Sequence, residues 1–212
     1  MFKTKESELI LDDIRYLIDY SNLQDNLLYK RSNIFCNLDD FKSYSKDISM
    51  GIPMLLPTNL DYFDYDNYSS FKLNKEDIAN KIFMTDKLDY IGVKQFIEKG
   101  LEFSTGGTPV EKSLSIISYI SDINKKCKDL VNELTKKGKT VCAFQTRNIP
   151  HLGHERIIEE GLKHCDYIIV NPLIGLRKKG DFKTEVIEKA FQFLIENFYG
   201  NKVIYAPIIA NM

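Results

Sequence analysis

The side chains best suited to chemistry in this chain are gathered in one run, Gln145-Thr-Arg-Asn-Ile-Pro-His-Leu-Gly-His154. Arginine, amide and imidazole groups donate hydrogen bonds to oxyanions. The run stands between a buried apolar segment, residues 140–144, and an amphipathic segment, and this pattern predicts a strand leading into a helix. The start of a helix presents free backbone N–H groups and a positive end. The run therefore predicts a pocket for phosphate-like or sulfate-like groups.

Two of the three histidines in the chain, His151 and His154, lie in this run in an HxGH pattern. Their spacing predicts that both side chains project from one side of the helix, and Gly153 would let backbone approach a ligand. A lone histidine is more often a hydrogen-bonded core residue, but this pair favours donation to phosphate oxygens during nucleotidyl transfer. The run contains no carboxylate, and none is expected nearby, because Asp or Glu would repel anionic substrates.

The elements that must position this run are regular from residue 113 onward. Apolar residues three and four apart predict a long helix that ends near Gly138, a residue suited to a helix C-terminus. Continuous apolar runs predict parallel strands covered on both faces. Alternating strands and helices with short links predict a doubly wound, Rossmann-like parallel sheet, with ligands at the carboxyl ends of its strands. The predicted strands are 140–144, 167–170 and 203–206, the helices are 153–164 and 184–198, and a polar loop covers 173–181.

The earlier part of the chain is less regular. Helical periodicity occurs at 6–20, 39–47, 75–82 and 91–100, whereas 50–70 predicts a short strand followed by a loop and 103–110 predicts a turn. The sequence therefore predicts two domains of the α/β class. A smaller α+β module covers residues 1–110, and a Rossmann-like domain covers residues 111–212.

Composition limits the class of protein. A net charge of −1 over 212 residues, with acidic residues among the aromatics at 61–71, argues against nucleic acid as a partner. No apolar stretch is long enough to span a membrane, and no signal-peptide core is visible, so a cytoplasmic protein without a membrane partner is expected. The absence of a CxxC pair favours reduced, partly buried thiols over disulfides or zinc ligands at the four cysteines, Cys36, Cys127, Cys142 and Cys165.

The string Gln145-Thr-Arg-Asn148, followed by a proline and an HxxH pair, resembles the ATP sulfurylase (sulfate adenylyltransferase) family of the HxGH nucleotidyltransferase superfamily. Asn171-Pro-Leu-Ile-Gly-Leu176 is similar to the family's H-P-L-V-G-L loop, with asparagine in place of histidine. Residues 206–212 resemble a segment that continues in the family as M-R-Y-A-G. Residues 81–110 look like the segment that joins the family's PUA-like N-terminal domain to its catalytic domain. The resemblance covers about residues 35–212 and is strongest from residue 140.

The resemblance implies a PUA-like module followed by a nucleotidyltransferase domain that transfers AMP from ATP to sulfate, giving adenylyl sulfate and pyrophosphate, with Mg²⁺ on the ATP. It implies that Gln145 and Arg147 hold sulfate and that His151 and His154 bind the ATP phosphates. The catalytic stretch would be Thr146, Arg147 and Asn148 with the two histidines. The nucleotide-binding set would be Gln145, Thr146, Arg147, Asn148, His151, Gly153 and His154.

Two alternatives stay open at this stage. The family's later G-R-D-H stretch has no counterpart here, so the domain is expected to be only the first half of the family's site, in a fragment or in a shortened relative that binds ATP or sulfate without catalysis. A homo-oligomer or a complementary subunit would then complete it. Alternatively, the acceptor is another anion, such as a phosphorylated or phosphonate-bearing metabolite. The basic residues Arg177, Lys178 and Lys179 would then contact it, although such a run more often forms a solvated basic loop.

Overall fold

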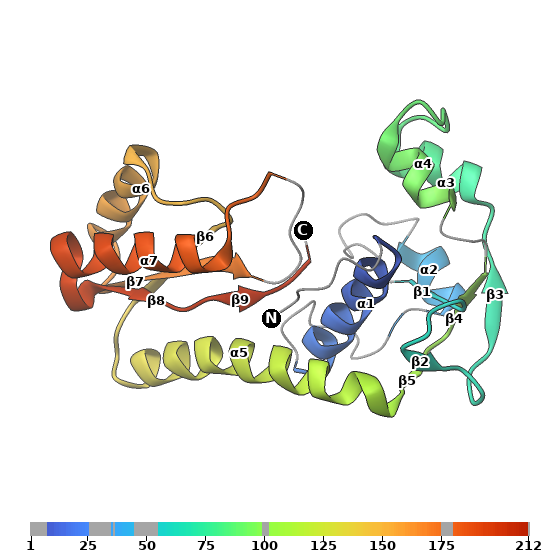
Figure 1. Cartoon of the computed structure of the whole chain (residues 1–212), viewed down its shortest axis with the longest axis horizontal. Coiled ribbons are helices and arrows are strands. Elements are labelled where there is room, and N and C mark those ends of the chain that lie inside the picture. The colour runs from blue at the N-terminus through green and yellow to red at the C-terminus, as the bar shows by residue number, and fades with distance from the viewer. Residues whose placement is uncertain are drawn as a thin grey trace. The chain divides into compact units, whose positions relative to one another are not determined.

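The computed structural model describes residues 8–25, 35, 37–44, 55–98, 102–174 and 180–211. The chain divides into two compact units, Asp12–Ile116 and Ile117–Met212. Figure 1 shows the elements of each unit. Among the described residues, no helix has both the length and the apolar character that crossing a membrane requires.

The unit Asp12–Ile116 combines helices with two small antiparallel sheets. One sheet has the order β1 (Leu56–Pro57), β4 (Glu102–Ser104) and β3 (Ser70–Lys72), and the other pairs β2 (Phe63–Asp64) with β5 (Thr108–Pro109). The helices are α1 (Glu8–Gln24), α2 (Leu38–Tyr44), α3 (Lys75–Phe83) and α4 (Ile91–Glu98). Its buried apolar side chains include Leu17, Ile18, Phe63, Val93 and Phe103. The mixed helix and strand content expected here is present, and the PUA-like assignment stays a prediction.

Two segments that were predicted as loop or turn contain strands. β2 lies in the stretch predicted as loop, β4 overlaps the start of the turn predicted at 103–110, and β5 lies within that turn. These strands pair with distant partners, as in Phe63 opposite Pro109, so no local periodicity marks them. Parts of other predicted elements, residues 45–47, 50–54 and 99–100, lie outside the described residues, as do the loop lysines and arginine at 177–179 and Cys36.

The second unit is built on a parallel sheet. β6 (Val141–Thr146), β7 (Tyr167–Ile174) and β8 (Val203–Tyr205) lie side by side in that order, and β9 (Ile208–Ile209) pairs in parallel with β7. Helix α6 (Leu152–Leu162) connects β6 to β7, and α7 (Thr184–Leu194) connects β7 to β8. The predicted α/β class and parallel sheet are confirmed. The finer assignment, a nucleotidyltransferase-type sheet, stays a prediction.

One face of the sheet packs on α6 and α7. The shared core consists of side chains that are all less than a tenth exposed, namely Ile158, Ile168, Val170, Ile187, Phe191, Leu194 and Val203. Alternate residues of β7 therefore point to the helices because side chains on a strand alternate between its faces. Figure 1 shows α6 and α7 on one side of the strands and α5 (Glu111–Lys136) on the other.

Two buried asparagines connect the other face to α5. The Asn171 Nδ2 donates to the Ala206 carbonyl at 2.9 Å and lies 3.1 Å from the Cys127 Sγ of α5. On α5, Asn124 accepts from the Ile209 backbone N–H at 2.7 Å and donates to its carbonyl at 2.8 Å. Burial of a polar amide is tolerated where its hydrogen bonds are made. Asn171, in the segment that resembles the family's loop, thus holds the chain between β8 and β9.

Several predicted boundaries move. Gly138 has a φ of 72° just after α5, which confirms it as the residue that ends this helix. β6 continues to Thr146 and β7 to Ile174, so Gln145 and Thr146 belong to a strand and not to a turn. The helix predicted at 184–198 ends as an α-helix at Leu194, and the chain continues as a π-helical turn, Ile195–Tyr199, and a short 3-10 helix, Gly200–Lys202.

Candidate functional site

Thr146 organises the turn at the carboxyl end of β6. It lies opposite Pro172 of β7 and is only 9% exposed. Its Oγ1 accepts a hydrogen bond from the Asn148 backbone N–H at 3.1 Å. The same oxygen lies 3.4 Å from the Nε2 of His154. The threonine therefore fixes both the start of the turn and the position of one histidine.

His151 is the N-cap of α6. Its backbone is extended, with φ −150° and ψ 171°, and its Nδ1 accepts from the Gly153 backbone N–H at 3.1 Å. Because Nδ1 is the acceptor, a neutral ring carries its proton on Nε2, which is then free to donate. A Cβ on Gly153 would lie 2.9 Å from the Cε1 of His151. The glycine thus makes room for the imidazole ring of His151. The sequence had instead predicted that it makes room for a ligand to approach the backbone.

His154 supports that ring from behind. It is 8% exposed and stacks on His151, with ring centroids 3.9 Å apart and planes at 25°. Phe144 and Phe191 lie 5.1 Å and 6.2 Å from it, centroid to centroid. Burial lowers the pKa of His154, the charge of His151 lowers it further, and the backbone of Ile149 opposes both effects. His154 is therefore a neutral, buried ring at neutral pH.

Arg147 pairs with a carboxylate that the sequence did not lead us to expect. Its Nη2 lies 3.7 Å from the Oδ1 of Asp181, and the two side chains are 35% and 18% exposed. The expectation that no carboxylate would lie near the run was therefore wrong. The carboxylate of Asp181 would still repel an anionic substrate, but the positive charge of the neighbouring Arg147 offsets this repulsion. The side chains of Gln145 and Asn148 are exposed at the same edge of the sheet.

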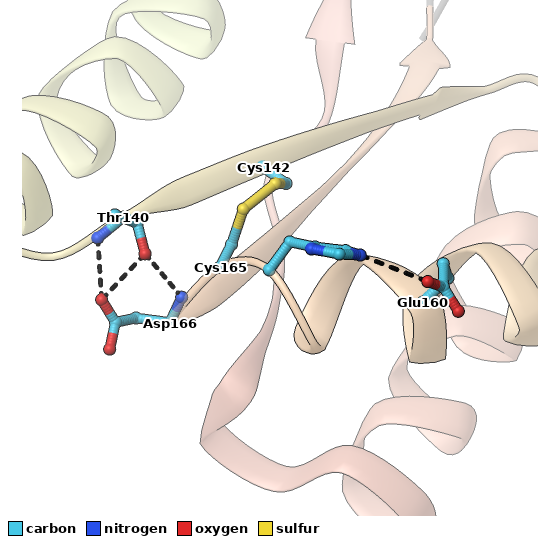
Figure 2. Close-up of a disulfide and its surroundings, with 6 residues drawn as sticks. Thr140, Cys142, Glu160, Cys165 and Asp166 are labelled. Atoms are coloured by element: carbon cyan, nitrogen blue, oxygen red, sulfur yellow. Dashed lines mark hydrogen bonds and ion pairs between the residues drawn. A yellow bond between two sulfur atoms is a disulfide. The ribbon is translucent and has the colours of Figure 1, made fainter.

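The cysteines differ from the sequence expectation. Cys142 of β6 and Cys165, just before β7, form a disulfide with Cα atoms 6.0 Å apart, so the prediction of reduced thiols is wrong for this pair and right for the partly buried Cys127. Spacing gave no hint because the two cysteines meet only when the strands pair. Figure 2 shows the disulfide beside Thr140 and Asp166, which are hydrogen-bonded to each other. This joint lies at the amino end of the strands, away from the HxGH run.

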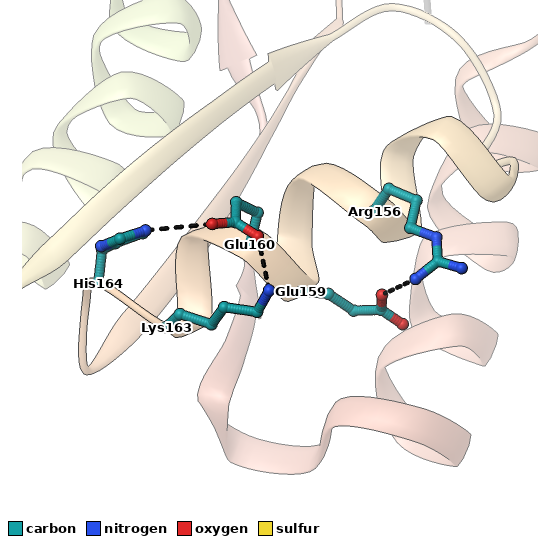
Figure 3. Close-up of polar contacts among 5 residues, drawn as sticks. All are labelled: Arg156, Glu159, Glu160, Lys163 and His164. Carbon is teal, nitrogen blue, oxygen red and sulfur yellow. Dashed lines mark hydrogen bonds and ion pairs between the residues drawn. The ribbon is translucent and has the colours of Figure 1, made fainter.

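The third histidine is also remote from the run. His164 lies just after the C-terminus of α6, where its Nε2 is 3.2 Å from a Glu160 oxygen (Figure 3). A hollow of about 420 Å³ is lined there by Thr140, Leu162, Lys163, His164, Cys165, Asp166 and Lys202. These residues lie at the end of α6 and just before β6, β7 and β8, at the amino edge of the sheet. Ligands in open parallel sheets bind at the opposite edge.

Metal-binding groups are not assembled in the part of the chain that is described. No set of three or more His, Cys, Asp or Glu side chains there is arranged to hold a metal ion. Mg²⁺ ligands in proteins are mainly carboxylates and substrate phosphates. Within the described residues, therefore, the side chains do not fit a resident metal.

The structure thus brings together Thr146, His151 and His154, and it places Arg147 against Asp181. Sequence reasoning missed Asp181 and the aromatic ring of Phe191 behind His154. A signal for Asp181 did exist, because the residues that follow two adjacent parallel strands meet at one edge of the sheet. Asp181 follows β7, and Arg147 follows β6.

Comparison with known proteins locates the similarity. A family model described as ATP-sulfurylase matches residues 122–212. The chain is 40% identical to a sulfate adenylyltransferase of Ignicoccus hospitalis over 56% of this chain and 31% of that protein. It is 35% identical to a sulfate adenylyltransferase of Pyrococcus abyssi over 63% of this chain and 35% of that protein. It is 28% identical to a sulfate adenylyltransferase of Thermococcus onnurineus over 92% of this chain and 57% of that protein.

The chain thus spans between about a third and somewhat more than half of the length of these relatives. The matched segment holds the parallel sheet, the HxGH run and the Arg147–Asp181 pair. The similarity to the ATP-sulfurylase family model therefore lies in residues 122–212.

Proposed function

We propose that this chain takes part in sulfate adenylyl transfer, in which AMP passes from ATP to sulfate and pyrophosphate is released. The observation that carries the proposal is the arrangement at the carboxyl end of β6, where Thr146 contacts His154, His154 stacks on His151, and Arg147 lies on the same turn. That arrangement falls within the segment of family similarity. The division into a PUA-like module, 1–110, and a nucleotidyltransferase domain, 111–212, is part of the same proposal.

In the proposed reaction a sulfate oxygen attacks the α-phosphorus of ATP. A new S–O–P bond forms while the bond from the α-phosphorus to its bridging oxygen breaks, and that oxygen leaves with pyrophosphate. Sulfate is fully ionised at neutral pH, so no general base is needed. Its problem is repulsion from ATP, which a fixed guanidinium and neutral donors reduce by holding both anions in line. Gln145 and Arg147 would hold sulfate, and Thr146 and Asn148 would shape the catalytic turn.

The phosphates would lie against the start of α6. His151 presents its Nε2–H there, because its Nδ1 is occupied by the Gly153 N–H. The helix N-terminus adds a partial positive charge. His154 would act mainly through the ring stack, since it is buried and its pKa is lowered. Mg²⁺ would enter with ATP, since the described residues offer no protein site for it.

The proposal is tested by measuring pyrophosphate release from MgATP and sulfate, with molybdate-stimulated ATP cleavage as a second assay. Arg147→Ala should lower kcat/KM by about 100-fold, the size of the loss of one transition-state donor. Arg156→Ala is the matched control, because this arginine of α6 is 84% exposed and pairs with Glu159 of the same helix (Figure 3). Undiminished activity of the Arg147 variant would contradict the assigned site.

A further inference from the structure

We infer that Asp181 is a positioning residue that acts through Arg147 and sets the charge preference of the anion site. The inference rests on the proposed function in one respect, namely that Arg147 binds the acceptor anion. The two residues come from neighbouring crossovers: Arg147 follows β6 and Asp181 precedes α7. Since β6 and β7 are adjacent and parallel, with Thr146 opposite Pro172, the segments that follow the two strands leave the sheet at the same edge.

The separation of the pair leaves Arg147 available to a ligand. The Nη2–Oδ1 distance is 3.7 Å, longer than the 2.7–2.9 Å typical of a charge-assisted hydrogen bond. A guanidinium has five N–H donors in a fixed plane, so one carboxylate at this distance orients it without occupying its donors. The arginine is also about twice as exposed as the aspartate, 35% against 18%. The carboxylate is therefore the more buried partner of the pair, and the guanidinium is the group that an anion from solvent reaches on its open side.

An anion bound on the open side feels both charges. The guanidinium attracts it, and the carboxylate just beyond repels it at a somewhat greater distance. Coulomb energy scales with the charge of the ligand, so the repulsion weighs about twice as heavily on a dianion as on a monoanion. Asp181 thus fixes the direction of Arg147 and at the same time weakens the binding of sulfate. Removing the charge should tighten sulfate binding while Arg147 loses its fixed orientation.

The test uses Asp181→Asn, which keeps the shape of the side chain and removes its charge. Glu185→Gln is the matched control, since this exposed residue in the first turn of α7 removes the same charge a short distance away. Binding of radiolabelled sulfate is measured by equilibrium dialysis, and nitrate is measured as a competitor, both with an ATP analogue whose α,β bridge cannot be cleaved. Arg147→Ala identifies the binding that belongs to this site.

Asp181→Asn should raise sulfate affinity about tenfold and nitrate affinity about threefold, in line with the twofold difference in charge. Glu185→Gln should change either affinity less than about twofold, and Asp181→Glu should restore the wild-type preference. Where turnover is measurable, Asp181→Asn should lower both the KM for sulfate and kcat. A purely structural role of Asp181 would not produce tighter sulfate binding together with slower turnover.

Several results would overturn the inference. They are a weaker or unchanged sulfate affinity in Asp181→Asn, an equal response in Glu185→Gln, binding that survives Arg147→Ala, and a wild-type chain that binds neither anion. Failure of the proposed function looks different. In that case Arg147-dependent sulfate binding and its response to Asp181→Asn remain, but no pyrophosphate is released.

Discussion

The imidazole ring of His151 lies stacked on that of His154, with ring centroids 3.9 Å apart. One ring caps α6 and is exposed, whereas the other is buried against Phe144 and Phe191. Two stacked imidazolium ions would repel each other at this distance, and the buried one would also lose hydration. The stack is therefore not arranged to hold two positive charges, and the buried ring of His154 stays neutral.

This arrangement predicts a pH dependence of stability. The pKa of His154 is lowered from its ordinary value of 6.5 in the folded protein, so the unfolded chain binds more protons in the interval below 6.5. The stabilisation from the neutral ring is fully present above that pH and is lost as the pH falls through the lowered folded-state pKa. Urea unfolding at about pH 7.5 and about pH 5.5 should show a smaller loss of stability in His154→Gln than in the wild type. His164→Gln, which changes an exposed histidine, should keep the wild-type loss.

A second prediction concerns Gly153. An added Cβ would lie 2.9 Å from the Cε1 of His151, so Gly153→Ala should displace the ring and break the cap, at a cost of about 1 kcal/mol in the free energy of unfolding. In a His151→Ala background the clash is gone, and the same change should stabilise the protein by about 0.5–1 kcal/mol, because alanine favours a helix over glycine. Chemical denaturation of the four proteins gives this comparison. If Gly153→Ala changes the free energy of unfolding equally in the wild type and in His151→Ala, the position of the His151 ring does not require a glycine at 153.

Thr146 supports a third prediction. Its Oγ1 accepts from the Asn148 N–H in a part-buried setting and contacts the Nε2 of His154 in a buried one. Thr146→Val keeps the shape but removes the hydroxyl, and should lower the free energy of unfolding by about 1–3 kcal/mol because a part-buried donor and a buried imidazole nitrogen lose their partner. Thr146→Ser retains the oxygen and should cost less. If valine and serine are equivalent in denaturation and in pyrophosphate release, the hydroxyl does not organise the turn.

The Cys142–Cys165 disulfide leads to a fourth prediction. The bridge closes a sequence separation of 23, and its reduction should lower the free energy of unfolding by about 2–4 kcal/mol. The sheet should persist on reduction, because Thr140 and Asp166 hold the same joint through three hydrogen bonds of 2.9 Å. Denaturation with and without a reductant measures the effect, and Cys142→Ser/Cys165→Ser should not respond to it. Alkylation of three thiols per chain at these positions and Cys127 without prior reduction would disprove the bridge.

The sequence by itself determined the strand, the turn and the helix around residues 145–154. It did so because the groups concerned are neighbours in the chain, and because apolar periodicity reports which side of each element is buried. The alternation of such elements also determined the parallel sheet, since short links between strands and helices permit few other topologies. Gly138 marked the end of α5 for a similarly local reason, a positive φ that glycine adopts at little cost.

Only the tertiary structure decided which distant groups enter the site. Asp181 meets Arg147, Phe191 covers His154, and Cys142 reaches Cys165 because β6 and β7 pair in one register and α7 packs on their shared face. A shift of that register by one residue would turn each side chain to the opposite face. The carboxylate beside Arg147 and the neutral state of the buried His154 therefore depend on how distant segments pack together. Neither can be predicted from one segment alone.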